Sequence, residues 1–435
     1  MISHKFRLNI SLSIILFSVI TKIIYDIEVI QILPDSYFPG VSYGKEFDTG
    51  KYVFGWILFV LFLIPYSLCY RNISFSSVVI QTLFYINFMP VCSSFGINNT
   101  KIYYIVLYSI FWFVILVLFK IFEKKYLKIP KVSIFKGYNL IFSVILVIIL
   151  LGIFLFTYSY NRLKVSFNLA DVYLYREKAT YIPAWIAWLK ASFGAVFLPL
   201  LASVYIEKKK IFQFAIITYI EILLFSIGMD KSFLFNYFIG LSISIINFKR
   251  ISARMIIPLI IFIGNLIALL EYFVFGTWAF FMLLIRRIFY LPTWLNYLYI
   301  EYFVHNDNLL FTQGIFILSS LLPDIINAPF ISSISNYYFK GKITNPNTGM
   351  LAFDFMQINF GSAISLPFLF LLILMNLENL FKKMSLRIKY IAGLIFAMLL
   401  TNVSILSRHF CLAVGIAFLL LYLLSKTKLA RESND

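Results

Sequence analysis

The sequence predicts an all-α polytopic membrane protein, and three observations lead to that prediction. Apolar residues make up 61% of the 435 residues, only 13% are charged, and the mean hydropathy is +0.90. Such a composition is too apolar for a soluble protein of this length. Apolar stretches of about 20 residues, the length needed to cross a bilayer, recur along the chain. Basic residues gather in short clusters between these stretches, so the net charge of +18 indicates membrane topology rather than nucleic-acid binding.

Twelve candidate spans follow from these stretches. They lie at roughly 8–25, 52–70, 75–95, 102–121, 138–160, 183–205, 211–228, 232–248, 255–274, 360–380, 390–406 and 409–425. The N-terminal stretch has a basic start and an apolar run but no small-residue cleavage site, so we expect it to remain as an uncleaved first span.

Basic residues orient these spans. If the N-terminus is cytoplasmic, strict alternation places most lysines and arginines inside, including Lys120, Lys208, Lys209 and Lys210. Both termini are then cytoplasmic. The chain forms a single integral membrane domain, 1–435, with large external segments at 161–182 and 275–359.

Several function classes lose support from the sequence. Neither GxxxxGK[ST] nor GxGxxG occurs, and the longest cytoplasmic connection, 122–137, is too short for a nucleotide-binding domain. We therefore do not expect ATP-driven transport or cytosolic nucleotide-sugar chemistry. The two halves of the chain show no internal repeat of the kind common in transporters. Cys69, Cys92 and Cys411 lack metal-ligand spacing and are expected to be small buried residues.

The stretch 271–361 is the longest between convincing spans and the most informative. Apolar and aromatic runs alternate with Arg286 and Arg287, with a histidine between acids, and with the polar turn 345–349. This mixture suits a segment lying along or dipping into the membrane surface, with polar groups directed at a charged ligand.

Arginines on the external face are candidates for binding phosphate. Arg176, Arg286, Arg287 and Arg408 remain where topology bias would remove them. A guanidinium binds phosphate oxygens in a bidentate manner, which suits a lipid diphosphate at the membrane surface. Contact with lipid headgroups or local pairing is the simpler interpretation for any single arginine, whereas for the tandem pair the two interpretations are equally favoured.

Other ionisable residues give weaker indications. His305 lies near Glu301 and Asp307 and can act as a base, although an ordinary surface histidine is the simpler interpretation; His409 is a second, weaker candidate.

Two pairs of charged residues lie within or beside spans, and each pair has two interpretations. Asp26 and Glu28 form a D-x-E pair that a metal-dependent glycosyltransferase would use, but a solvated loop edge is favoured. Lys190 and Glu221 lie at equal depths in adjacent spans, so we expect a salt bridge between them, with an ion relay as the alternative.

Three stretches carry a resemblance to a known family. They are YREKATYIPAW (175–185), GTWAFFMLLIRRIFYLPTWLNYLY (276–299) and NPNTGMLAFDFMQINFG (345–361). With the layout of about a dozen spans and a late large external segment, the chain resembles the Wzy family of O-antigen and oligosaccharide repeat-unit polymerases of bacterial inner membranes. A GT-C-like architecture is compatible with this layout.

The resemblance implies a glycosyltransferase that moves a growing glycan from undecaprenyl diphosphate onto a lipid-linked repeat unit at the periplasmic face. It implies membrane lipid and a chain-length regulator protein as partners, and no cofactor or metal. The arginines would stabilise the departing diphosphate, and a carboxylate or histidine would take the acceptor's proton.

The residues for these roles are Arg286 and Arg287 on the diphosphate, Arg176 and Arg408 as secondary contacts, and His305 or Asp354 near the acceptor. The aromatic residues Tyr290, Trp294, Tyr297 and Tyr299 would dock sugar faces or the polyprenyl chain, or serve as an interfacial anchor. An O-antigen ligase and a lipid-linked oligosaccharide flippase or other transporter remain alternatives.

Overall fold

The computed structural model describes most of the apolar segments of the chain. The described residues are 4–38, 41–69, 73–122, 152, 184–228, 231–246, 253–309, 330–341, 349, 360–381, 384–401 and 415. Within them the chain is helical apart from one short antiparallel hairpin, β1 (Ser36–Phe38) with β2 (Val41–Ser42).

The described helices fall into two groups in chain order, before residue 123 and after residue 183. The first group is α1 (His4–Gln31), α2 (Thr49–Cys69), α3 (Phe75–Leu83), the π-helical η1 (Phe84–Phe88), α4 (Met89–Ile97) and α5 (Ile102–Phe122). The second begins with α8 (Ala184–Ser192), the π-helical η4 (Phe193–Phe197), α9 (Leu198–Glu207), α10 (Ile211–Gly228) and α11 (Lys231–Ile245). It continues with the 3-10 turn η5 (Ala253–Met255), α12 (Ile256–Phe275), the π-helical η6 (Phe281–Tyr290), α13 (Leu291–His305), α14 (Phe330–Phe339), α16 (Phe360–Phe381) and α17 (Leu386–Leu400).

Six helical stretches among the described residues are long and apolar enough to cross a membrane. They are Thr49–Ser67, Phe75–Ile97, Ile102–Ile121, Leu189–Glu207, Ile256–Phe275 and Gly361–Asn379. Two shorter apolar stretches, Ile211–Ser226 and Phe233–Ser244, coincide with further predicted spans. The prediction of a helical membrane protein is confirmed at this level, whereas two of the twelve predicted spans, 138–160 and 409–425, lie outside or almost outside the described residues.

Burial separates a central helix from peripheral ones. In Phe75–Ile97, 94% of the most apolar window is buried, against 28% in Thr49–Ser67 and 33% in Ile256–Phe275. The peripheral helices expose large apolar side chains such as Phe54, Leu61 and Ile267. Because exposed apolar rows of this kind are stable only in contact with lipid, α2 and α12 lie at the perimeter of the bundle.

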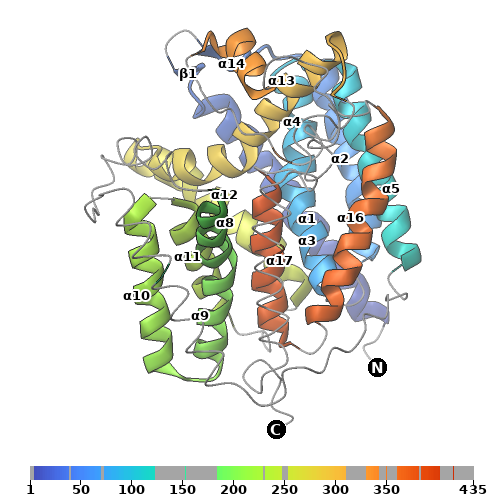
Figure 1. Cartoon of the computed structure of the whole chain (residues 1–435). Helices are drawn as coiled ribbons and strands as arrows, with labels where there is room; N and C mark the ends of the chain where they lie inside the picture. The colour runs from blue at the N-terminus through green and yellow to red at the C-terminus, as the bar shows by residue number, and fades with distance from the viewer. Residues whose placement is uncertain are drawn as a thin grey trace.

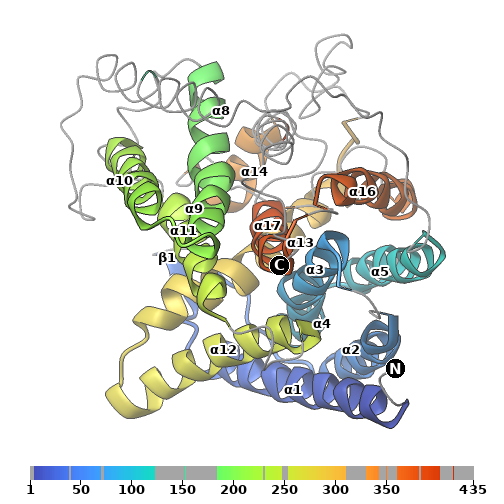
Figure 2. The ribbon, with the colours of Figure 1, turned by 90° about the horizontal axis from the view of Figure 1, so that it is seen from below.

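The helices pack in neighbouring pairs that are distant in sequence. In Figures 1 and 2, α1 lies beside α12 and α5 beside α16, while α17 lies against α3 and reaches toward the group formed by α9, α10 and α11. The pair α2 and α4 crosses closely at Gly55 and Gly96, where a Cβ would overlap Cys92 and Tyr52 respectively. Small residues at such crossings allow helix backbones to approach in membrane proteins.

Each π-helical segment among the described residues ends two positions before a proline. Pro90 follows η1, Pro199 follows η4 and Pro292 follows η6. A proline has no N–H and its ring crowds the carbonyl four residues earlier, so a local i to i+5 pattern accommodates it. The amide of Leu291, for example, donates to the Arg286 carbonyl.

The two ends of the bundle differ. The hairpin, α13 and α14 lie together at the upper end in Figure 1, where α1 ends and α2 and α5 begin. The ends of α5 and α9 that carry Lys120 and Lys208 lie at the lower end. We call the upper end the hairpin end.

Candidate functional site

The tandem arginines lie on η6, and the sequence before η6 explains its direction. After α12 the chain turns at Gly276, whose φ of +64° is favourable for glycine. The Glu271 carboxylate then accepts hydrogen bonds from the Ala279 amide (3.1 Å), the Phe280 amide (2.7 Å) and the Thr277 hydroxyl (2.9 Å). A carboxylate at a helix N-terminus satisfies amides that have no partner in the helix. Glu271 therefore fixes the tight reversal from α12 into η6.

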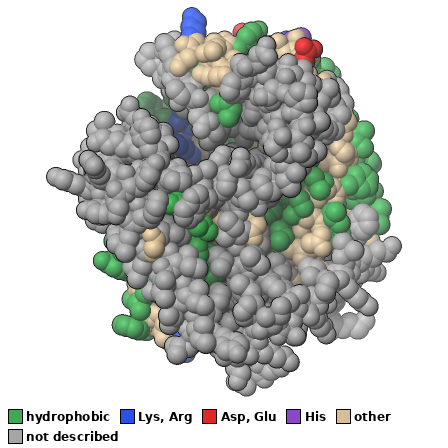
Figure 3. Space-filling model, in the orientation of Figure 1, with side chains coloured by type: hydrophobic (Ala, Val, Ile, Leu, Met, Phe, Trp, Pro, Cys, Tyr) green, Lys and Arg blue, Asp and Glu red, His purple; other side chains and the backbone are tan. Residues whose placement is uncertain are grey.

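The two arginines differ in exposure. Phe281, Ile285 and Phe289 bury the inner face of η6, whereas Arg286 is half-buried and Arg287 is exposed. No described residue pairs with Arg287. Basic side chains are visible on the upper half of the face shown in Figure 3.

Arg286 is held by the hairpin through Tyr43. Its Nε donates to the Tyr43 hydroxyl at 2.6 Å, and its guanidinium carbon lies 5.7 Å from the ring centre. The hydrogen bond is therefore the main contact and the ring face a minor one. Tyr43 is itself buried, with the rings of Tyr290 at 5.2 Å and Trp294 at 5.0 Å in edge-to-face arrangement.

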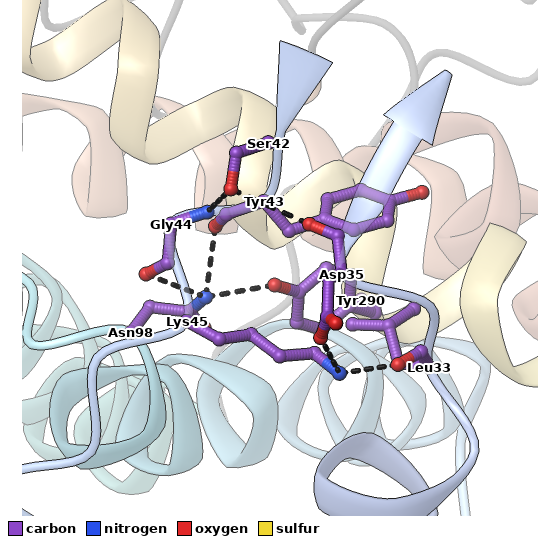
Figure 4. A network of polar contacts seen from close by, with 8 residues as sticks. All are labelled: Leu33, Asp35, Ser42, Tyr43, Gly44, Lys45, Asn98 and Tyr290. Atoms are coloured by element: carbon purple, nitrogen blue, oxygen red, sulfur yellow. Dashed lines mark hydrogen bonds and ion pairs between the residues drawn. The ribbon is translucent and has the colours of Figure 1, made fainter. Parts of the chain in front are cut away.

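A polar network fixes the hairpin over this site (Figure 4). Asn98, the residue that caps α4, donates through Nδ2 to the Tyr43 carbonyl (3.0 Å) and to the Tyr290 hydroxyl (2.8 Å). The Lys45 ammonium donates to the Leu33 carbonyl just beyond α1 and lies 3.7 Å from Asp35. The Asn98 side-chain amide and the Lys45 ammonium therefore link α1, α4, the hairpin and the start of α13.

Burial shifts the pKa of groups in this network. Partial burial lowers the pKa of Lys45, and the opposing charge of Asp35 offsets part of that effect. Burial raises the pKa of the Tyr290 hydroxyl, while the hydrogen bond from Asn98 and the charge of Arg286 act the other way. Tyr290 is therefore a neutral hydrogen-bond partner near pH 7.

Other predicted site residues are distant from Arg286 or outside the described part. His305 is exposed at the last residue of α13. The helix from Arg286 to His305 is continuous through η6 and α13, so the two lie roughly 28 Å apart along it. The structure thus does not bring His305 to the arginines. Arg176, Asp354, Arg408 and His409 lie outside the described residues.

The aromatic residues predicted to dock substrate are mostly part of the core. Tyr290 is 2% exposed, Trp294 5% and Tyr299 0%, and only Tyr297 is partly accessible. Tyr290 and Trp294 thus belong to the core in this structure, and their docking role stays a prediction. Rows of aromatic side chains have the same composition at a membrane interface and in a protein core, so the sequence did not separate the two.

The D-x-E pair of α1 does not form a common site. Asp26 accepts from Lys22 (2.8 Å) and Tyr52 (2.8 Å), deep between α1 and α2. Glu28 is fully buried, and both of its oxygens lack a hydrogen-bond partner. Residues two apart on a helix point to nearly opposite sides, so both carboxylates cannot hold one ion. Among the described residues, no group of three His, Cys, Asp or Glu side chains could hold a metal.

The predicted salt bridge between Lys190 and Glu221 is wrong. The Lys190 ammonium lies 5.5 Å from the ring centre of Phe233 on α11, and both Glu221 oxygens are buried without a hydrogen-bond partner. Equal depth in the membrane says nothing about the direction in which a side chain leaves its helix. Here Lys190 is turned toward α11 rather than toward α10.

Gly349, the one described residue of the predicted polar turn 345–349, contacts α13. Its amide donates to the Asn296 side-chain oxygen at 3.2 Å. A Cβ at this position would lie 2.6 Å from the Leu400 carbonyl oxygen and would also overlap Thr401, so only glycine fits against the end of α17. The sequence predicted a turn at 345–349, but it did not predict the hydrogen bond between Gly349 and Asn296.

Two buried side chains, Tyr43 and Lys22, were not predicted as site residues. Tyr43 gave no signal in the sequence. Lys22 did, because it is a lysine within an apolar run with Asp26 one helical turn later.

The fold and its apolar helices define a helical integral membrane protein. Comparison with family models, with curated proteins and with solved structures gave no match.

Proposed function

We propose that the chain is an O-antigen polymerase of the bacterial inner membrane. It would have twelve spans and both termini in the cytoplasm, and it would act at the periplasmic face. The supporting observation is that Arg287 is exposed and unpaired among the described residues, while its neighbour Arg286 binds Tyr43 beside the hairpin, at the end of the bundle opposite Lys120 and Lys208. A guanidinium in that position suits the diphosphate of an undecaprenyl-linked glycan.

The reaction is a displacement at the anomeric carbon of the donor glycan. The acceptor hydroxyl oxygen forms the new bond, the bond to the diphosphate breaks, and undecaprenyl diphosphate leaves with the electron pair. Arg287, with Arg286 held beside it by Tyr43, would stabilise the charge that develops on the leaving group. Arg176 and Arg408 remain proposed secondary contacts.

A base must take the proton of the acceptor hydroxyl, and we propose Asp354 rather than His305 for that role. A base near the anomeric carbon has to lie close to the diphosphate, whereas His305 lies roughly 28 Å along the helix from Arg286.

Reconstitution with a lipid-diphosphate-linked repeat unit tests this proposal. We expect the wild-type protein to form a ladder of glycans. Arg287→Ala should lower the rate by ~10²-fold or more because one charge-stabilising group is lost. Arg287→Lys should recover only part of it, since a lysine offers one point charge and not a planar fork.

The matched control is Lys210→Ala, which removes an exposed basic side chain beside α10 at the other end of the bundle. It should leave the ladder unchanged. A full ladder from Arg287→Ala would contradict the proposed diphosphate site, and no ladder from folded wild-type protein would contradict polymerisation.

The same reconstituted protein distinguishes the polymerase from the two alternative functions, ligase and flippase. Transfer of the glycan to a lipid A–core acceptor would indicate a ligase. Movement of the lipid-linked unit across the bilayer without transfer would indicate a flippase, which the buried Lys22, Asp26 and Glu28 of α1 favour because transporters use intramembrane charges.

A further inference from the structure

A group of tyrosines surrounds Glu301 at the far end of α13 from Arg286. Glu301 accepts hydrogen bonds from Tyr297 (3.2 Å) on its own helix and Tyr338 (3.4 Å) on α14, and it forms an ion pair with Lys101 at 3.2 Å. We call Lys101, Tyr297, Glu301, Tyr302, Tyr337 and Tyr338 the tyrosine platform.

Three rings of the platform, those of Tyr302, Tyr337 and Tyr338, are in contact and partly open. Tyr337 is 68% exposed and lies edge-to-face against Tyr302 (5.4 Å between centres) and Tyr338 (4.8 Å). These contacts hold Tyr337 in place although most of its surface is free. An ordered and exposed aromatic ring is prepared to receive a ligand because little side-chain entropy is lost on binding.

The polar groups of the platform are balanced in charge. Lys101 and Glu301 neutralise one another, and Tyr297 and Tyr338 contribute hydroxyls to the same carboxylate. The hydroxyl of the neighbouring Tyr103 is buried without a hydrogen-bond partner in the structure.

We propose that the tyrosine platform binds a glycan. A pyranose ring presents apolar C–H faces to aromatic rings and a rim of hydroxyls that both donate and accept hydrogen bonds. The platform offers the matching set, which is flat aromatic surface together with a carboxylate, an ammonium and phenolic hydroxyls. Its balanced charge disfavours a phosphate or an acidic peptide.

The position of the platform distinguishes it from a lipid anchor. Interfacial tyrosines form a belt around the perimeter of a membrane protein. Instead, α13 and α14 form the upper end of the molecule in Figure 1, and their contact joins Trp294 to Phe339 at 5.8 Å as well as Tyr302 to Tyr337.

The platform adds a second binding point to the proposed polymerase, and in that respect it rests on the proposed function. Residues 287 and 301 are separated by ~20 Å of helix, which is enough for several sugar rings. A glycan whose diphosphate lies at Arg287 is therefore long enough to rest its distal sugars on Tyr337. Glu301 and His305 are one turn apart on α13, so His305 lies at the edge of the platform, where it would contact glycan rather than act as the base.

Binding can be measured without transfer, by saturation-transfer NMR on the protein in nanodiscs. The probe is the oligosaccharide released by mild acid from the lipid-linked pool of cells that make this protein. We expect transfer to the sugar protons with the wild-type protein and with Tyr337→Phe, which keeps the ring. Tyr337→Ala should bind about tenfold more weakly, because the exposed ring is lost.

Tyr219→Ala is the matched control. Tyr219 is 63% exposed, but it lies on the outer surface of α10, away from the platform. Its loss should leave sugar binding unchanged. Equal binding by Tyr337→Ala and wild type, or no saturation transfer with wild type, would overturn the proposal.

The outcome is separable from that of the polymerase assay. Normal sugar binding in a protein that makes no glycan ladder would keep the platform and reject polymerisation. A normal ladder with no binding of the free oligosaccharide would reject the platform and keep the polymerase.

Discussion

At the scale of single residues, the buried ion pair of α1 is the feature with the largest expected effect on stability. Lys22 and Asp26 are both almost completely inaccessible and lie 2.8 Å apart. Lys22 also donates to Ser93 (2.8 Å) and lies 4.2 Å from the centre of the Trp56 ring. Each charge depends on the other, because an isolated charge in such a site costs several kcal/mol.

Removal of one partner should therefore be more harmful than removal of both. Asp26→Asn leaves the Lys22 ammonium without a counter-ion, and we expect a loss of ~3–5 kcal/mol in the free energy of unfolding. The double substitution Lys22→Met with Asp26→Leu should recover much of it. Thermal unfolding in detergent measures both.

A control comes from the ion pair between Asp35 and Lys45 beside the hairpin. The Asp35 side chain is fully exposed and lies 3.7 Å from Lys45, so Asp35→Asn should leave the unfolding temperature almost unchanged. If Asp26→Asn unfolds at the same temperature as Asp35→Asn, the pair in α1 does not act as described.

At the scale of elements, each π-helical segment among the described residues is followed by a proline. Pro199 leaves the Ala195 carbonyl without its usual α-helical donor, and Asn236 of α11 supplies one through Nδ2 at 2.9 Å. The carbonyl left free by the proline in the η4–α9 helix thus forms a hydrogen bond with the neighbouring helix α11. Pro65 and Pro367 lie inside α2 and α16 without a π segment, so a proline permits this geometry and does not impose it.

The coupling between Pro199 and Asn236 can be measured. Asn236→Ala should cost ~1–3 kcal/mol of unfolding free energy, because a buried carbonyl loses its donor. In a Pro199→Ala background the loss should be smaller, because the backbone amide at 199 can again serve the helix.

The control is Asn376→Ala, which removes a comparable amide that donates to the Leu372 carbonyl in an exposed part of α16. It should have little effect. Equal losses from Asn236→Ala in both backgrounds would show that the amide does not compensate for the proline.

At the scale of the whole molecule, the two ends of the bundle should face opposite sides of the membrane. The basic residues near the ends of α5 and α9 contrast with the hairpin end, where α13, α14 and the arginines of η6 lie. Basic clusters favour the cytoplasmic side, so the hairpin end should be periplasmic.

Single cysteines in a cysteine-free background test that orientation. We expect Lys340→Cys, just beyond α14, to react with a membrane-impermeant maleimide applied to intact spheroplasts. Lys210→Cys, between α9 and α10, should react only after permeabilisation. The reverse pattern would invert the topology and remove the basis for a periplasmic diphosphate site.

Much of the architecture was predictable because it depends on local composition. The spans predicted at 102–121, 211–228 and 255–274 match α5, α10 and α12 closely, since hydropathy over about 20 residues is sufficient to define a membrane helix. The tandem arginines Arg286 and Arg287 could also be identified as candidate binding residues from the sequence alone. Their separation from His305 follows from the continuous helix, which the sequence could not distinguish from a folded-back loop.

The sequence by itself determined the class of protein, the positions of the described membrane helices and the presence of arginines in the late segment, because each of these is a property of neighbouring residues. Only the tertiary structure decided that Tyr43 holds Arg286, that Lys190 turns away from Glu221, and that Tyr290 and Trp294 are core while Tyr337 is open. The reason is rotational: depth and composition are fixed along the chain, whereas the direction in which each side chain leaves its helix depends on packing against distant helices.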